Sequence, residues 1–109
     1  MTEEEARKSG RQIKIGKFPY SSNGHAMAIG ETDGFVKIVG DAENGEILGV
    51  HILGAHATEL ISESVVAKTM EAAVEDLAEA IHAHPTLSEA VMEAAMGWNK
   101  RAVHTPKNS

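Results

Sequence analysis

The sequence contains no cysteine. Without a thiol, the chain cannot form a disulfide framework, a thiolate metal site or a redox-active dithiol of its own. No apolar run approaches the roughly 18 residues of a membrane span. Basic residues are fewer than acidic ones, 10 against 16, and the net charge is -6. This balance, with no basic cluster to offset it, disfavours nucleic acid and anionic membranes as partners.

The N-terminal residues 1–5 lack the basic and apolar regions of a secretory signal. We therefore expect a soluble, intracellular protein, either cytoplasmic or, in a eukaryote, of the mitochondrial matrix. A chain of 109 residues with 42% hydrophobic content fits one domain with a modest core. It is too short for a nucleotide-binding domain plus a catalytic one, so we predict a single domain over 1–109.

The first half of the chain carries signals for a helix and a strand. Thr2 and Glu5 have capping-box spacing, and acidic residues followed by basic ones suit the two ends of a short helix, which Gly10 should stop. Residues 12–18 alternate between polar and apolar, which predicts a half-buried strand ending at Pro19. Residues 20–33 are mixed and give no firm prediction.

Two β-rich runs, 34–39 and 47–53, flank the turn segment 41–46. Its Asn44-Gly45 step supplies the positive φ that a tight turn needs. These runs predict an antiparallel hairpin.

Helical periodicity begins after Gly54. One apolar stripe comprises Leu60, Ile61, Val65, Met70, Ala73 and Val74. A second, short helix is predicted over 75–81, and a last helix begins near Ser88. The apolar face of the last helix carries Val91, Met92, Ala95 and Met96, and Met70, Met92 and Met96 suit core packing. We expect the tail 99–109 to be frayed. Strands that precede most of the helices predict an α+β fold, an antiparallel sheet with helices packed on it.

The segment His82-Ala83-His84-Pro85-Thr86-Leu87-Ser88-Glu89 is the strongest candidate site. Histidine titrates near neutral pH, proline fixes the adjacent backbone, and a carboxylate can orient an imidazole as a proton carrier. Spacing alone, however, favours Glu89 as a helix cap that reaches back to Thr86. Pro85 also ends the preceding helix without any chemistry.

Other interpretations of the histidines are weaker. His82 and His84 are candidate metal ligands, but His-x-His without a third ligand at fixed spacing is a poor metal signal, so we predict no metal site. His51 lies within the second hairpin strand and suits a sheet surface or an interface better than catalysis. The glycines near the hairpin have no phosphate-cradling spacing.

The octapeptide at 82–89 resembles the His-x-His-Pro-Thr-Leu-Ser-Glu signature of the dihydrolipoamide dehydrogenases. The stretch 34–63, with Gly49-Val50-His51-Ile52-Leu53-Gly54 and Ala57-Thr58-Glu59-Leu60-Ile61-Ser62-Glu63, is similar to the C-terminal dimerisation domain of the pyridine-nucleotide-disulfide oxidoreductases. This resemblance covers nearly the whole chain. It implies an antiparallel sheet with helices, and a homodimer to which we expect the apolar faces of the hairpin and the last helix to contribute.

The resemblance also implies a site shared between two subunits. His84 would be the acid/base and Glu89 its orienting carboxylate, while His82 and Pro85 would lie near the flavin without that role. The full enzymes bind FAD and NAD and oxidise dihydrolipoamide carried by an acyltransferase complex, at a disulfide that one subunit supplies and the histidine of the other serves. We further expect His84 and Glu89 to be hydrogen-bonded and the His84-Pro85 bond to be cis.

The flavin and nicotinamide domains of that family have no counterpart in this sequence. We expect the chain to be a fragment cut just inside the domain, a cut that would remove its first strand, with no bound cofactor and no activity alone. Two other functions remain open. One is a stand-alone dimeric interaction module without catalysis, with 98–109 as a docking segment. The other is a small metal-dependent hydrolase that uses His82 and His84.

Overall fold

The computed structural model describes residues 1–80, 82 and 86–98. His84, Pro85 and the tail 99–109 lie outside these residues. The predictions of a His84–Glu89 bond, a cis proline and a frayed tail therefore concern parts that the structure does not describe.

The described chain is an antiparallel three-stranded sheet with helices, which confirms the predicted α+β fold. The sheet has the order β1-β2-β3 and consists of β1 (Ile13–Pro19), β2 (Gly34–Asp41) and β3 (Ile47–Gly54). The helices are α1 (Glu3–Lys8), the 3-10 turn η1 (Tyr20–Ser22), α2 (Gly24–Ile29), α3 (Ala57–Thr69), α4 (Val74–Glu79) and α5 (Glu89–Trp98).

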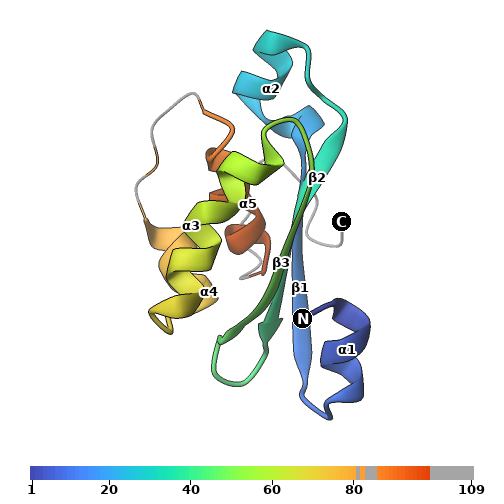
Figure 1. The fold of residues 1–109 in the computed structure, drawn as a ribbon, viewed down its shortest axis with the longest axis vertical. Coiled ribbons are helices and arrows are strands. Elements are labelled where there is room, and N and C mark those ends of the chain that lie inside the picture. Colours follow the sequence, from blue (N-terminus) through green and yellow to red (C-terminus); the bar gives the residue numbers. More distant parts are fainter. Residues whose placement is uncertain (81, 83–85, 99–109) are drawn as a thin grey trace.

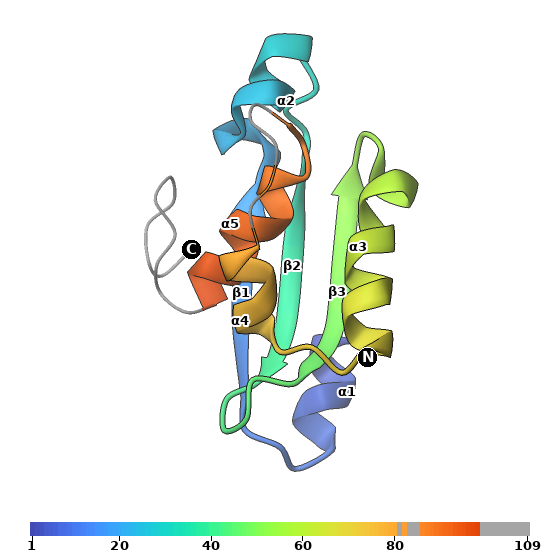
Figure 2. The same ribbon diagram turned by 90° about the vertical axis from the view of Figure 1, so that its left-hand side faces the viewer.

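The helices form layers on both sides of the sheet. Helices α3, α4 and α5 lie on one side, whereas α1 lies on the other, near the end of the sheet where the hairpin turns (Figure 1). Seen from the helix side, α5 lies over β1 and β2, and α3 runs beside β3 (Figure 2). The main core therefore lies between the sheet and the three later helices.

The local predictions for α1 and the hairpin are confirmed. The Thr2 hydroxyl accepts from the Glu5 backbone N–H at 3.1 Å, and the Glu5 carboxylate accepts from the Thr2 backbone N–H at 3.0 Å. Strands β2 and β3 pair antiparallel, with a register shift between Val39 and Gly40. Gly45 has a φ of 78°, as the turn requires.

A close contact between strand and helix positions α5. A Cβ on Gly16 of β1 would clash with the Ala94 carbonyl oxygen, so only glycine allows the helix backbone to approach this closely. Apart from Glu93, the buried residues of α5 share one face at helical spacing: Ala90, Val91, Ala94, Ala95 and Trp98. This face differs from the predicted one, because Met92 and Met96 are only half-buried.

The predicted stripe on α3 is confirmed at Leu60, which is buried, and is wrong further along the helix. The helix ends at Thr69, so the stripe cannot continue to Val74, and Val65 and Met70 are exposed. The inward line instead comprises Leu60, Ser64 and Ala67, at i, i+4 and i+7. Two of these side chains are small, so hydrophobicity alone gave no sign of which face meets the sheet.

No helix among the described residues is both long enough and apolar enough to cross a membrane.

Candidate functional site

His82 lies between α4 and the segment 83–85, and both of its ring nitrogens have oxygen partners. Nδ1 lies 2.9 Å from the Ala80 carbonyl oxygen, and Nε2 lies 2.5 Å from Oε2 of Glu63 on α3. Because a peptide carbonyl can only accept, Nδ1 carries a proton. The contact between Nε2 and Glu63 is then a hydrogen bond whose proton is carried either by Nε2 or by the carboxylate. The His82 side chain is only 7% exposed.

Glu89 is the first residue of α5, and its carboxylate caps that helix. The Thr86 backbone N–H donates to Glu89 Oε1 at 2.9 Å. This is the capping bond that the spacing favours, and it satisfies one of the amides at the helix start. A carboxylate has two oxygens, so the cap does not exclude a further role for Glu89.

Asn23 holds the same region from the other end of the chain. Its side-chain amide donates to the Thr86 carbonyl oxygen at 2.9 Å, while its Oδ1 accepts from the Ala26 backbone N–H at 2.8 Å and caps α2. Asn23 is 4% exposed, so this amide is buried with both of its ends bonded. The α2 start and the α5 start are thereby joined directly.

The structure pairs the predicted residues His82 and Glu89 with Glu63 and Thr86, and not with each other. His82 and Glu89 lie on either side of the segment 83–85, and the catalytic candidate His84 lies within that segment. Glu63 and Asn23 were missed as members of the site. Their partners lie 19 and 63 residues away in the sequence, and no local pattern marks them.

The described histidines do not form a metal centre. No group of three histidine, cysteine or acidic residues suited to a metal ion occurs within the described part of the chain. His82 has both nitrogens engaged by oxygens, and His51 lies on β3, where its Nε2 is 3.0 Å from the Met1 carbonyl oxygen. His51 is therefore a sheet residue, as predicted.

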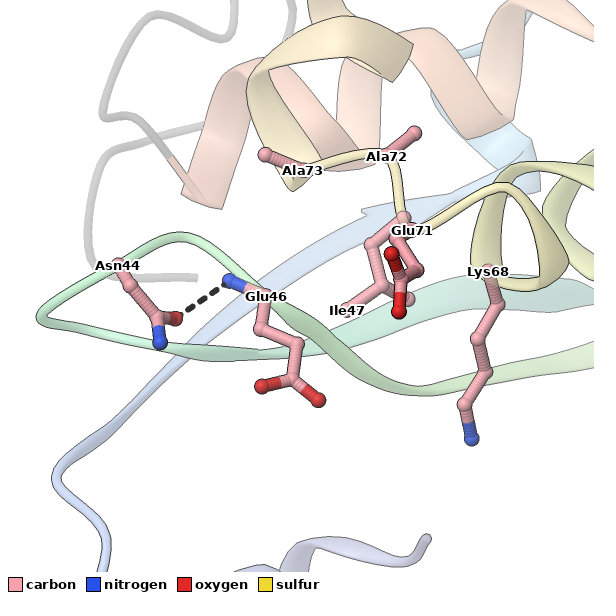
Figure 3. A pocket seen from close by; sticks show the side chains of 7 residues that line it. All are labelled: Asn44, Glu46, Ile47, Lys68, Glu71, Ala72 and Ala73. Carbon is pink, nitrogen blue, oxygen red and sulfur yellow. Dashed lines mark hydrogen bonds between the residues drawn. The ribbon is translucent and has the colours of Figure 1, made fainter.

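A hollow of about 460 Å³ lies beside the hairpin turn and the end of α3 (Figure 3), and its lining does not suit FAD or NAD. It is lined by Asn44, Glu46, Ile47, Lys68, Glu71, Ala72 and Ala73. Two carboxylates against one ammonium disfavour a pyrophosphate there, and no glycine-rich loop between a strand and a helix offers backbone amides.

Comparisons with known proteins agree with this fold. Residues 1–95 match the family model described as pyridine nucleotide-disulphide oxidoreductase, dimerisation domain. The dihydrolipoyl dehydrogenase of Thermus scotoductus is 52% identical over 95% of this chain, and that of Bacillus subtilis is 49% identical over 95%. The chain spans 23% and 22% of the length of these two relatives.

Solved structures show the same likeness. The Cu(II) complex of the HOCl-induced flavoprotein disulfide reductase RclA from Escherichia coli superposes with a TM-score of 0.83 at 27% identity, covering 87% of this chain and 22% of that chain. LpdA from Mycobacterium tuberculosis superposes with a TM-score of 0.80 at 26% identity, covering 87% of this chain and 21% of that chain. The chain therefore belongs to the pyridine nucleotide-disulphide oxidoreductase family, of which it carries the dimerisation domain.

Proposed function

We propose that this domain, over 1–109, works within a homodimeric dihydrolipoyl dehydrogenase. In this proposal, His84 and Glu89 of one subunit form the acid/base pair at the disulfide and flavin site of the partner. The support is the match of residues 1–95 to the dimerisation domain, together with relatives that are dihydrolipoyl dehydrogenases. The same relatives disfavour a stand-alone interaction module.

The proposed step is a proton transfer. His84 takes the proton of a dihydrolipoamide thiol, and the resulting thiolate attacks one sulfur of the partner's disulfide, whose other sulfur leaves as a thiolate. The second thiol then loses its proton and attacks the lipoamide sulfur of this mixed disulfide, which closes the lipoamide disulfide and expels the partner's other sulfur. The two protons released by the substrate complete the partner's dithiol. The rest of the whole protein would hold FAD and NAD, which would supply the acceptors for the electron pair. A lipoyl-bearing acyltransferase would deliver the substrate, in the cytoplasm or the mitochondrial matrix.

Exposed apolar residues on α3 and at its C-cap, Met70, support the homodimer. Val65, Val66 and Met70 are 56%, 57% and 76% exposed. The apolar residues of α5 are largely buried in the chain's own core, so α3 replaces the last helix as the proposed contact. Light scattering at tens of micromolar, where an interface of standard size holds, should give the mass of two chains. A mass of one chain would contradict the homodimer.

Catalysis is tested in a chimera. The Thermus scotoductus enzyme would carry this chain in place of its matching segment, with His84→Gln or Glu89→Gln. We expect His84→Gln to lower kcat for dihydrolipoamide by about 100-fold or more, because the base is lost. Glu89→Gln keeps a capping oxygen, so its effect should be smaller. The oxidation of NADH by an artificial one-electron acceptor, which needs no thiol proton transfer, should persist in both variants.

An unchanged dihydrolipoamide rate in His84→Gln would overturn the catalytic assignment. Loss of both reactions would also contradict it, because such a loss follows from damage to the fold or to flavin binding.

A further inference from the structure

The two described residues that flank 83–85, His82 and Thr86, are both held by hydrogen bonds. On one side, His82 is bonded through its ring to Ala80 and to Glu63. On the other side, the Thr86 carbonyl oxygen accepts from Asn23 and the Thr86 amide donates to Glu89. Side chains from α3, from α5 and from the residue that caps α2 thus hold the two residues that flank this segment.

The covalent chain limits how far His84 can lie from these anchors. His84 is two residues from His82 and two from Thr86. Consecutive Cα atoms are about 3.8 Å apart, and two steps span at most about 7 Å. Any displacement of His82 therefore changes the range of positions that the His84 backbone can reach.

The bond between His82 and Glu63 connects this segment to α3. The His82 side chain is 7% exposed, whereas the Glu63 side chain is 32% exposed, so the imidazole is the more enclosed partner. Removing the carboxylate would leave Nε2 without its hydrogen-bond partner in a mostly buried place, which favours movement of the ring toward water. Removing an exposed carboxylate elsewhere on α3 would have no such effect.

We propose that Glu63 is a positioning residue, which holds His82 and thereby sets the location of His84 for proton transfer. This inference rests on the proposed function of His84. Glu63 itself touches no substrate, and its effect passes through His82. This role requires a hydrogen bond to Nε2 of His82, and it does not require the negative charge of Glu63.

The test compares Glu63→Ala with Glu63→Gln. The Gln amide can donate to Nε2 of a neutral ring whose Nδ1–H bonds Ala80, so it restores the anchor without the charge. In the chimera, Glu63→Ala should lower kcat for dihydrolipoamide about tenfold, since misplacement of a catalytic group by about 1 Å has effects of this order or larger. We expect Glu63→Gln to recover most of that loss. The KM for NAD and the NADH reaction with an artificial acceptor should stay unchanged.

Glu59 provides a matched control. It is exposed on the same helix, one turn before Glu63. Glu59→Ala and Glu59→Gln make the same chemical changes on α3 and should leave kcat unchanged.

A second readout needs no cofactor. In the 109-residue chain, diethyl pyrocarbonate should modify His82 slowly, since the ring is enclosed and both nitrogens are bonded. Glu63→Ala should raise that rate severalfold, as measured by mass spectrometry, and Glu63→Gln should raise it less. The double variant Glu63→Ala with His82→Ala should turn over no more slowly than His82→Ala alone, because coupled residues are not additive.

The outcomes separate the two proposals. If His84→Gln is slow while Glu63→Ala turns over normally, the positioning role is wrong and the function of His84 stands. If His84→Gln turns over normally, the proposed function itself is wrong. If Glu63→Gln is as slow as Glu63→Ala, or if the NADH reaction falls in parallel, Glu63 does not act by placing His82.

Discussion

Helices α5 and α3 lie on the same side of the sheet (Figure 2), but they differ in how far their apolar residues are buried. In α5, Val91 and Trp98 are buried against β1 and β2, and Gly16 lets the helix backbone touch the strand. In α3, Leu60 faces β3 with small residues, while Val65 and Val66 face outward. The apolar face of α5 is therefore buried within the chain. The exposed apolar residues of α3 would be buried only if a second surface covered that helix. This contrast favours α5 as part of the chain's own core and α3 as a surface for a partner.

The largest effect should come from closing the space between β1 and α5. Gly16→Ala places a Cβ against the backbone carbonyl of Ala94. The Cβ is fixed directly to the strand backbone, so relief of the clash requires a shift of the strand or of the helix. We expect the free energy of unfolding of the 109-residue chain to fall by about 3 kcal/mol in urea titration. Gly24→Ala, whose Cβ would meet nothing within 4 Å, is the control and should change it by less than about 0.5 kcal/mol. Equal stability of the two variants would contradict the close contact between β1 and α5.

A second test applies the same substitution to both helices. Val91→Ala removes two buried methyl groups from α5 and should cost about 2 kcal/mol of unfolding free energy. Val65→Ala removes the same atoms from an exposed position on α3 and should cost less than about 0.5 kcal/mol. Urea titration at a protein concentration low enough to disfavour association measures both. Similar losses would show that Val65 contributes as much to the core as Val91 does.

The third test concerns association. Val66→Lys puts a charge into the proposed apolar contact on α3 and should weaken the homodimer at least tenfold, which corresponds to about 1.4 kcal/mol. Ile29→Lys makes the same change at an exposed apolar residue of α2 and should leave association unchanged. Sedimentation equilibrium measures the dissociation constant. Weakening by Ile29→Lys alone would move the contact away from α3.

The smallest effect should be a pH-dependent loss of protection in α1. This helix contacts the sheet through Ala6, and the interactions of its acidic side chains also stabilise it. The hydrogen bond from Arg7 lowers the pKa of Glu3, assisted by Lys37, and the Thr2 backbone N–H lowers the pKa of Glu5. Because the folded pKa values lie below the ordinary 4.5, the stabilisation is present above that pH and is lost as the pH falls through the folded values. Hydrogen exchange of the α1 amides should therefore lose protection between about pH 5 and about pH 3 while α5 keeps it.

Glu3→Gln is the control for this pH dependence. It removes one titrating carboxylate, so the pH-dependent part of α1 protection should shrink. Protection of α1 that does not change with pH in the unaltered chain would contradict the role of these two groups.

The parts of the fold that depend on neighbouring residues were predictable from the sequence. The Thr2–Glu5 capping box and the Asn44-Gly45 turn are local, and their residue types dictate one backbone geometry. The direction that α3 faces was not predictable. Its inward positions include Ser64 and Ala67, which give no hydrophobic signal, while the apolar side chains of Val65 and Val66 are exposed.

The contacts of the candidate site likewise divide into local ones, which the sequence predicts, and long-range ones, which it does not. Glu89 as a cap follows from its spacing to Thr86. The anchors Glu63–His82 and Asn23–Thr86 join residues far apart in the sequence, and no spacing rule predicts such contacts. The role of His84 came from resemblance and remains a proposal.

The Asn23–Thr86 bond also has a consequence for the order of folding. It joins residues 63 positions apart, and contacts between distant residues form slowly because a long loop must close first. The hairpin and α1 can form from short segments as soon as these leave the ribosome. The bonds of Thr86 to Asn23 and Glu89 can form only once the chain has been synthesised as far as the start of α5. We therefore expect refolding to show β-sheet signals before Thr86 becomes protected from exchange, so that the scaffold exists, briefly, without the site.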